Sequence, residues 1–332
     1  MIRLGIIGTG RIAKRFVYDA WQGLDVEIVG VYNPHMESAE KFCTENHVKN
    51  AYSDWDLFIH AIEAVYVASP LGTHAEYVKK ALEAGIHVLC EKPMVVSGAQ
   101  AEELFALADE KQCVLMEGIK TAYSPGYKKL RELLEEKLIG EIRDVEACFT
   151  KLVKPGLREW THLEDCGSMT ELGSYGCFAV LSILGEDYVE SHHVSLRNEN
   201  GVDIFTKVFF SYHSYAMGLV KSGIGVKSEG ELLISGTKGY ILVKAPWWMP
   251  KCIEVHFEDA NKTQIYTCEY VGNGLQYELE HFVKRIKGTQ MASGVTKEQS
   301  IKIAYIMEEF LRQEKDYRIV RKRFRYGEKD GI

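Results

Sequence analysis

The stretch Met1-Ile2-Arg3-Leu4-Gly5-Ile6-Ile7-Gly8-Thr9-Gly10-Arg11-Ile12-Ala13 decides the fold of this 332-residue chain. A short apolar run, typical of a buried strand, leads into the pattern G-x-G-x-x-G/A, and a helical pattern follows over residues 11–20. The first glycine permits a tight turn, the second lets the backbone approach a pyrophosphate, and the small final residue allows the helix to pack closely on the strand. Amide groups at the helix N-terminus would bind the pyrophosphate, although a purely structural turn is the alternative. The residues expected to bind a dinucleotide here are Gly8, Thr9, Gly10, Arg11, Ile12 and Ala13.

The first third of the chain alternates between strand and helix patterns. Strands are predicted at residues 2–7, 26–32, 64–68, 87–90 and 114–116, and helices at residues 11–20, 37–46, 73–84 and 97–111. Alternating units of this length make right-handed crossovers between parallel strands. We therefore expect an α/β fold with a parallel sheet over residues 1–120.

The regular alternation of strand and helix patterns ends at about residue 120. Strands are predicted at residues 142–151, 188–197, 203–212, 215–223, 229–235 and 240–243, and helices at residues 125–138, 275–287 and 297–315. Turn signals such as Glu199-Asn200-Gly201 separate several of these strands, as hairpins require. The pattern predicts a second domain over residues 121–332, of the α+β class, built on an antiparallel sheet.

Composition limits the partners and the compartment. The net charge is -7, with 40 basic and 47 acidic residues dispersed along the chain, which argues against nucleic acids and anionic membranes as partners. No apolar run approaches the roughly 18 residues that cross a bilayer, and the glycine loop leaves no room for a signal sequence. The eight cysteines show no zinc spacing, and His192-His193 alternate faces on a strand. These features predict a cytoplasmic protein with a small-molecule partner and no metal.

Two further segments lie where a cofactor would bind. Asn33 ends the second predicted strand, where an acidic residue usually binds the ribose, and it can still hydrogen-bond ribose hydroxyls. It lacks the charge that repels a 2′-phosphate, and no arginine stands beside it, so NAD and NADP both remain open, with a lean to NAD. The segment Ser69-Pro70-Leu71-Gly72-Thr73-His74 follows the third long strand at the ligand-binding edge of such a sheet. From it we expect cofactor contacts by Ser69, Pro70, Thr73 and His74, with helix capping by Thr73 as the alternative.

The step Cys90-Glu91-Lys92-Pro93 follows the fourth long strand. A lysine at the carboxyl edge of the sheet could reach a bound dinucleotide, and this position makes hydride chemistry the leading hypothesis. A solvated surface ion pair followed by a loop proline is the alternative.

These motifs together resemble the Gfo/Idh/MocA oxidoreductase family. The resemblance covers nearly the whole chain in order, and it lies nearest the branch that contains dimeric dihydrodiol dehydrogenase and D-xylose dehydrogenases. Its motifs are Gly8-Thr9-Gly10-Arg11-Ile12-Ala13, Ser69-Pro70 with Thr73-His74, Glu91-Lys92-Pro93, Leu115-Met116-Glu117-Gly118, Gly167-Ser168-Met169-Thr170-Glu171-Leu172-Gly173-Ser174-Tyr175 and Gly236-Thr237-Lys238-Gly239.

The resemblance implies a fold, a function and an assembly. The fold is an N-terminal Rossmann domain with a doubly wound parallel sheet over residues 1–120, followed by an α+β domain with a large open antiparallel sheet. The resemblance also implies NAD(P)-dependent oxidation or reduction of a hydroxyl or carbonyl centre on a sugar, cyclitol or related polyol. Lys92 and Tyr175 would take part in proton transfer, Glu91 and Lys92 would contact the cofactor, and Glu171 would bind substrate. The second domain would bind substrate and associate through one face of its open sheet into a homodimer or homotetramer, and its last helices could pack back on the first domain.

The chain departs from the family pattern at two positions. Glu171 stands where relatives usually carry aspartate, and Ala122 stands where they often carry arginine. Arg158, Trp160 and His162 precede the second motif and could line a polar sugar pocket, with a surface loop as the alternative. The departures also keep two other functions open: a dinucleotide-binding sensor without catalytic activity, and a redox-neutral glycoside-processing enzyme that holds NAD.

Overall fold

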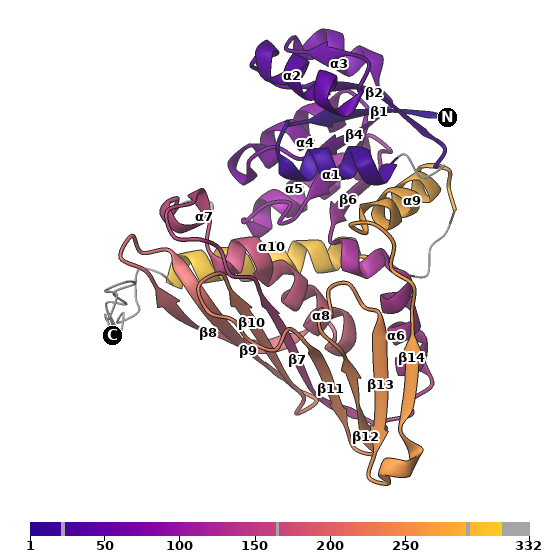
Figure 1. The fold of residues 1–332 in the computed structure, drawn as a ribbon, viewed down its shortest axis with the longest axis vertical. Helices are drawn as coiled ribbons and strands as arrows, with labels where there is room; N and C mark the ends of the chain where they lie inside the picture. Colours follow the sequence, from indigo (N-terminus) through magenta and orange to yellow (C-terminus); the bar gives the residue numbers. More distant parts are fainter. Residues whose placement is uncertain (21–23, 164–165, 290–292, 314–332) are drawn as a thin grey trace, which may run out of the picture.

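A six-stranded parallel sheet forms one half of the molecule (Figure 1). The computed structural model describes residues 1–20, 24–163, 166–289 and 293–313. The order β3-β2-β1-β4-β5-β6 is that of a doubly wound nucleotide-binding sheet and confirms the predicted Rossmann fold. Its strands are β1 (Ile2–Ile7), β2 (Val26–Tyr32), β3 (Ala51–Tyr52), β4 (Ala64–Val67), β5 (His87–Glu91) and β6 (Leu115–Gly118).

Helices cover both faces of this sheet. All four residues of β4 are buried, as expected for a central strand that packs against helices on either side. The predicted strands and long helices are present, whereas β3 and α3 were not expected from the sequence. The helices of this half are α1 (Arg11–Ala20), α2 (Met36–Asn46), α3 (Trp55–Ala61), α4 (His74–Glu83) and α5 (Gly98–Glu110).

An eight-stranded sheet forms the other half (Figure 1). Its order is β14-β13-β12-β11-β7-β10-β9-β8, and the pairing of β7 with β10 is parallel while the other pairings are antiparallel. The large open sheet was expected, but it is mixed rather than purely antiparallel. Its strands are β7 (Ile142–Thr150), β8 (Tyr188–Arg197), β9 (Asp203–Tyr212), β10 (Met217–Gly223), β11 (Leu232–Gly236), β12 (Gly239–Val243), β13 (Cys252–Phe257) and β14 (Gln264–Thr267).

One face of the second sheet carries the larger core. Val208 and Phe210 of β9 point into this core, and a Cβ on Gly218 of β10 would lie 2.6 Å from Val180 of α8 (Ser174–Leu184). Phe209, between the two buried residues, is 44% exposed. This alternation shows that α8 covers one face of the sheet while the other face stays open.

The last two long helices contact the first half of the molecule. The carboxylate of Asp19 on α1 accepts hydrogen bonds from the amides of Asn273 and Leu275, at the start of α9 (Leu275–Ile286). Leu279 and Phe282 of α9 belong to one core cluster of the first sheet. In α10 (Lys297–Gln313), Glu308 accepts a hydrogen bond from the amide of Gly98 on α5. In the part of the chain that the structure describes, no helix combines the length and apolar character that crossing a membrane requires.

Candidate active site

The glycine loop joins β1 to α1 with the geometry that a dinucleotide requires. Gly8 has φ of +103°, and a Cβ there would lie 2.6 Å from the carbonyl oxygen of Ala68, so a side chain is excluded. A Cβ on Gly10 would meet nothing within 4 Å, so the backbone is open to a ligand at that point. Ala13 is fully buried, and Ile12 packs beside it on the same core cluster. These features fit the binding of a pyrophosphate at the N-terminus of α1.

Asn33 and Thr9 meet at the ends of β2 and β1. The side-chain amide of Asn33 donates to Thr9 Oγ1 over 2.9 Å, and its oxygen accepts from the amide of His35 over 2.9 Å. Asn33 is therefore held in a fixed orientation beside the glycine loop. Its uncharged side chain lies where the ribose of a dinucleotide would be expected.

The turn after β4 is organised around His74. This imidazole is 3% exposed, with Nε2 2.9 Å from the carbonyl oxygen of Ser69 and Nδ1 3.1 Å from that of Pro93. Burial lowers the pKa of His74, although the two carbonyls oppose that shift. Thr73 is at the N-cap position of α4, but its hydroxyl accepts no capping hydrogen bond; it donates to Ser69 Oγ or to the carbonyl oxygen of Pro70. His74 thus ties the turn after β4 to the turn after β5.

Lys92 lies close to Tyr175 and contacts Glu171. In the sequence, 79 positions separate Lys92 from Glu171. Lys92 Nζ donates to the backbone carbonyl oxygen of Glu171 over 2.9 Å and lies 5.9 Å from the centroid of the Tyr175 ring. Lys92 follows β5, whereas Tyr175 lies in the first turn of α8. The contact therefore brings the two halves of the molecule together at the carboxyl edge of the first sheet.

A π-helical turn, η3 (Met169–Gly173), precedes α8 and presents this carbonyl group. In an ordinary α-helix the four-residue spacing of Glu171 and Tyr175 would place both on one face, but this turn is π-helical. The carbonyl oxygen of Glu171 in this turn accepts the hydrogen bond from Lys92, and such turns are frequent at functional sites. The Glu171 side chain is half-buried, and its charge contributes to the electrostatic environment of Tyr175.

Tyr66 orients Glu91, a contact that the sequence did not reveal. The Tyr66 hydroxyl donates to one carboxylate oxygen of Glu91, and the Lys92 amide donates to the other. Tyr66 on β4 is opposite Leu89 of β5, and Glu91 lies two residues further along on the same face. With both side chains buried, Glu91 is held next to Lys92.

Aromatic side chains pack against Tyr175 and its neighbour Phe149. The ring of Phe149 on β7 lies 5.2 Å from that of Tyr175 at a steep angle, and its other neighbour, Trp248, stacks on it at 3.6 Å. Burial, followed by the charges of Glu91 and Glu278, raises the pKa of Tyr175 well above its ordinary value. Tyr175 therefore keeps its proton at neutral pH and can donate it.

The short helix α7 (Arg158–Thr161) carries the other residues predicted for substrate binding. Arg158 and His162 are exposed, and His162 Nδ1 lies 3.0 Å from the hydroxyl of Thr161. Trp160 is only 8% exposed and belongs to the core of the second sheet, where its indole donates to the carbonyl of Val153. Trp160 therefore serves the core rather than an open sugar pocket or a surface loop, which corrects both sequence-based interpretations.

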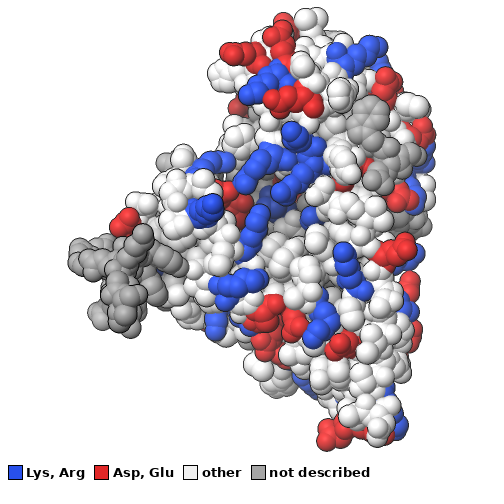
Figure 2. Space-filling model, in the orientation of Figure 1, with Lys and Arg blue, Asp and Glu red and all other residues white. Residues whose placement is uncertain are grey.

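The same helix contacts the glycine loop. Glu159 accepts a hydrogen bond from the Arg11 guanidinium over 2.7 Å, an ion pair that the sequence did not suggest. Lys14 and Arg15 on α1 are also exposed. Figure 2 shows lysine and arginine side chains gathered across the middle of this face, between the two sheets. A cationic surface of this kind attracts the phosphates of a dinucleotide.

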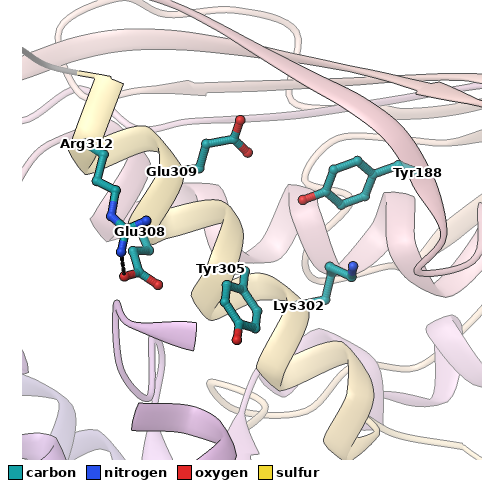
Figure 3. Close-up of a pocket in the computed structure, with 6 residues that line it drawn as sticks. All are labelled: Tyr188, Lys302, Tyr305, Glu308, Glu309 and Arg312. Carbon is teal, nitrogen blue, oxygen red and sulfur yellow. Dashed lines mark hydrogen bonds and ion pairs between the residues drawn. The ribbon is translucent and has the colours of Figure 1, made fainter. Parts of the chain in front are cut away.

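A separate hollow lies away from these residues. It is formed by Tyr188 of β8 and by Lys302, Tyr305, Glu308, Glu309 and Arg312 of α10 (Figure 3). No residue predicted for the active site lines this hollow, and in it the ammonium of Lys302 lies 5.1 Å from the ring centroid of Tyr188. Among residues 1–20, 24–163, 166–289 and 293–313, no group of three or more His, Cys, Asp or Glu side chains is placed to hold a metal ion.

The fold and this site define an NAD(P)-dependent oxidoreductase. Residues 2–119 match an oxidoreductase family with an NAD-binding Rossmann fold, and residues 127–242 match the GFO/IDH/MocA C-terminal domain. The chain belongs to the Gfo/Idh/MocA family, and it is a dehydrogenase or reductase that acts on CH–OH groups.

Similar proteins cover almost the whole chain. The scyllo-inositol 2-dehydrogenase (NADP(+)) IolU of Bacillus subtilis is 30% identical over 94% of this chain and 97% of its own length. A trans-1,2-dihydrobenzene-1,2-diol dehydrogenase of Xenopus laevis is 28% identical over 93% of this chain and 97% of its own length. The solved structure of KijD10, a 3-ketoreductase from Actinomadura kijaniata in complex with NADP and TDP-benzene, shares the fold with a TM-score of 0.81. That similarity covers 92% of this chain and 96% of KijD10 at 23% identity.

Proposed function

We propose that this enzyme transfers a hydride between NAD(P) and a hydroxyl or carbonyl centre of a sugar, cyclitol or related polyol, with Lys92 and Tyr175 in proton transfer. The observation that carries the proposal is the position of Lys92 Nζ, 5.9 Å from the centroid of the Tyr175 ring at the carboxyl edge of the first sheet. Relatives named for inositol and dihydrodiol substrates support a vicinal hydroxyl pattern in the substrate.

The cofactor residues follow from the loops at this edge. The glycine loop would hold the pyrophosphate, Asn33 and Thr9 would face the adenosine ribose, and the turns containing Ser69 and Glu91 would face the nicotinamide end. When bound, the nicotinamide supplies or accepts the hydride. The proposed compartment is the cytoplasm, and the proposed cofactor preference leans to NAD because Asn33 has no arginine beside it. The relative named with NADP(+) and the structure with bound NADP favour the phosphorylated cofactor instead, so the ratio of the two dissociation constants is a direct test.

Proton transfer falls to two groups of this chain. As hydride leaves an alcohol carbon, the hydroxyl oxygen must release its proton, and in the reverse direction the carbonyl oxygen must gain one. Tyr175 would exchange this proton through its phenolic oxygen. The ammonium of Lys92, fixed by the Glu171 carbonyl, would stabilise negative charge on either oxygen. Glu171, Arg158 and His162 would contact the remaining hydroxyls of the substrate.

We also propose that the open face of the second sheet joins subunits into a homodimer or homotetramer. Val194, Phe209 and Met217 are 51%, 44% and 60% exposed on neighbouring strands β8, β9 and β10. Large exposed apolar patches often mark interfaces between proteins. Light scattering on the wild type and on Phe209→Glu tests this assembly, since a monomeric wild type contradicts it.

Substrate screening with matched variants tests the reaction. Purified protein is mixed with sugars, cyclitols and polyols, and the absorbance of the reduced cofactor is followed at neutral and alkaline pH. Lys92→Ala is expected to lower kcat by about 10²-fold or more. Lys79→Ala serves as the control, because Lys79 forms an exposed pair with Glu103 on α4 and α5. If the cofactor binds but no substrate changes its redox state, the sensor interpretation replaces this proposal.

A further inference from the structure

Glu278 is a buried carboxyl group that the reaction described above does not use. It lies in the first turn of α9 with 0% exposure. Neither of its carboxyl oxygens has a hydrogen-bond partner among the described residues. Because buried polar groups in folded proteins are nearly always paired, an exception of this kind calls for an explanation.

The position of this carboxyl group is informative. A Cβ on Gly118 would lie 3.4 Å from one Glu278 oxygen and 3.5 Å from the other, and 3.2 Å from the carbonyl oxygen of Cys90. Gly118 ends β6 and pairs with Glu91 at the end of β5. The Glu278 carboxyl therefore lies beside the carboxyl ends of β5 and β6, and Lys92 directly follows β5.

Charged groups from three other elements surround Glu278. Burial, the charge of Glu91 and that of Asp19 raise the pKa of Glu278, while the charge of Lys120 opposes the shift. Lys120, in η2 (Lys120–Tyr123), donates from Nζ to the carbonyl oxygen of Asn273 over 2.6 Å. Lys120 thus connects the segment before α9 with the loop after β6.

We propose that Glu278 is a positioning residue that sets the electrostatic potential at Tyr175 and Glu91, with Lys120 as its counter-charge. This inference rests on the proposed function of Tyr175 in proton transfer. Glu278 acts through the charged groups around it and does not touch the substrate. An unpartnered buried acid destabilises the fold, and such residues are typical of sites where activity is kept at a cost in stability.

The proposal predicts the direction in which each substitution changes the pKa of Tyr175. Lys92 from the end of β5 lies 5.9 Å from the centroid of the Tyr175 ring. The other titratable groups that act electrostatically on Tyr175 are Glu91 from β5, Glu171 from η3, Tyr270 from the segment before α9, Glu278 from α9 and Tyr66 from β4. Burial comes first among the causes that raise the pKa of Tyr175, and the charges of Glu91 and Glu278 follow. At pH values where Glu278 is ionised, replacing it by an uncharged residue lowers the pKa of Tyr175. Removing the positive charge of Lys120 raises it.

The first experiment compares pH profiles of kcat/KM. Glu278→Gln is expected to move the alkaline limb to lower pH by about 0.5 to 1 unit, and Lys120→Gln is expected to move it to higher pH. The Tm of Glu278→Gln is expected to equal or exceed that of the wild type. Glu63→Gln is the control, because Glu63 pairs with Arg3 in an exposed position at the opposite edge of the sheet. An alkaline limb that stays in place in Glu278→Gln overturns the proposal, as does a shift of equal size in the control.

A second experiment does not depend on turnover. Tyrosinate absorbance is titrated in the wild type and in Glu278→Gln, each with and without Tyr175→Phe, so that the difference isolates Tyr175. A lower midpoint for Tyr175 in Glu278→Gln supports the proposal, and an unchanged midpoint overturns it. If Glu278→Gln does not fold, Lys120→Gln tests the same electrostatic coupling with the opposite sign, and an unchanged midpoint for Tyr175 in that variant overturns the proposal. A wild type that binds cofactor but reacts with no substrate refutes the proposed function alone, because this titration still decides the role of Glu278.

Discussion

Arg11 and Glu159 form an ion pair of 2.7 Å between the glycine loop and α7, across 148 positions of the sequence. The Arg11 side chain is 80% exposed, whereas that of Glu159 is 15% exposed. The pair therefore joins the glycine loop to α7, and it places one predicted cofactor residue in contact with the helix that carries Arg158.

Breaking this pair is expected to speed the exchange of cofactor. An ion pair with one exposed partner contributes about 1 kcal/mol or less, so Glu159→Gln should raise the release rate of NAD(P)H by about two- to fivefold with little change in Tm. Stopped-flow fluorescence of the reduced cofactor measures this rate. Glu63→Gln, which breaks an ion pair away from the cleft, should leave it unchanged, and equal rates in both variants contradict the prediction.

Tyr175→Phe is expected to separate chemistry from binding. The ring contact with Phe149 is retained, so the fold and cofactor affinity should change little, while kcat falls by about 10²- to 10⁴-fold. Steady-state kinetics and cofactor titration measure the two effects. A large loss of cofactor affinity with normal kcat would show that Tyr175 binds rather than transfers a proton.

Asn33→Asp is expected to shift the choice of cofactor towards NAD. The carboxylate can still accept a hydrogen bond from the His35 amide, and it can accept one from the Thr9 hydroxyl in place of the amide contact. Its charge repels a 2′-phosphate, so NADP affinity should fall by about tenfold or more relative to NAD. Calorimetric titration of both cofactors measures the ratio, and Thr9→Val, which adds no charge, is the control.

Glu117 makes stability depend on pH. Burial raises the pKa of Glu117 from 4.5 to about 7, while the Met94 amide that donates to it opposes the shift. A pKa raised in the folded state gives a contribution to stability that is complete below pH 4.5 and is lost as the pH rises through 7. Glu117→Gln, which does not titrate, should therefore gain in Tm relative to the wild type as the pH rises across that range. Parallel Tm curves for the two proteins would contradict this assignment.

The parts of the fold that could be predicted have local patterns. The glycine loop and the apolar strands of the first sheet follow from spacing and burial alone. Strands β3, β13 and β14 were missed, and of these β3 contains only two residues, too few for a periodic pattern. The parallel pairing of β7 with β10 could not be read from the chain either, since it depends on which strands meet after α8 is placed.

The candidate site also contains some contacts that could be predicted from the sequence and others that could not. Lys92 and Tyr175 could be paired because a family resemblance supplied both motifs. The contact of Tyr66 with Glu91 depends on the register between two strands, and that of Arg11 with Glu159 depends on how the two sheets are placed. Trp160 was misassigned because an aromatic residue in a polar segment gives no sign of whether it faces a pocket or the core.

The hydrogen bonds from the start of α9 to Asp19 have a consequence for how this molecule can evolve. A helix from the last fifth of the chain completes the hydrophobic cluster of the first sheet, with Leu279 and Phe282 among its members. The beginning and the end of the chain therefore have to be inherited together. In a recombinant with residues 1–120 from one ancestor and the remainder from another, α9 would have to pack correctly on the first sheet before the active-site residues of the two parts could be aligned.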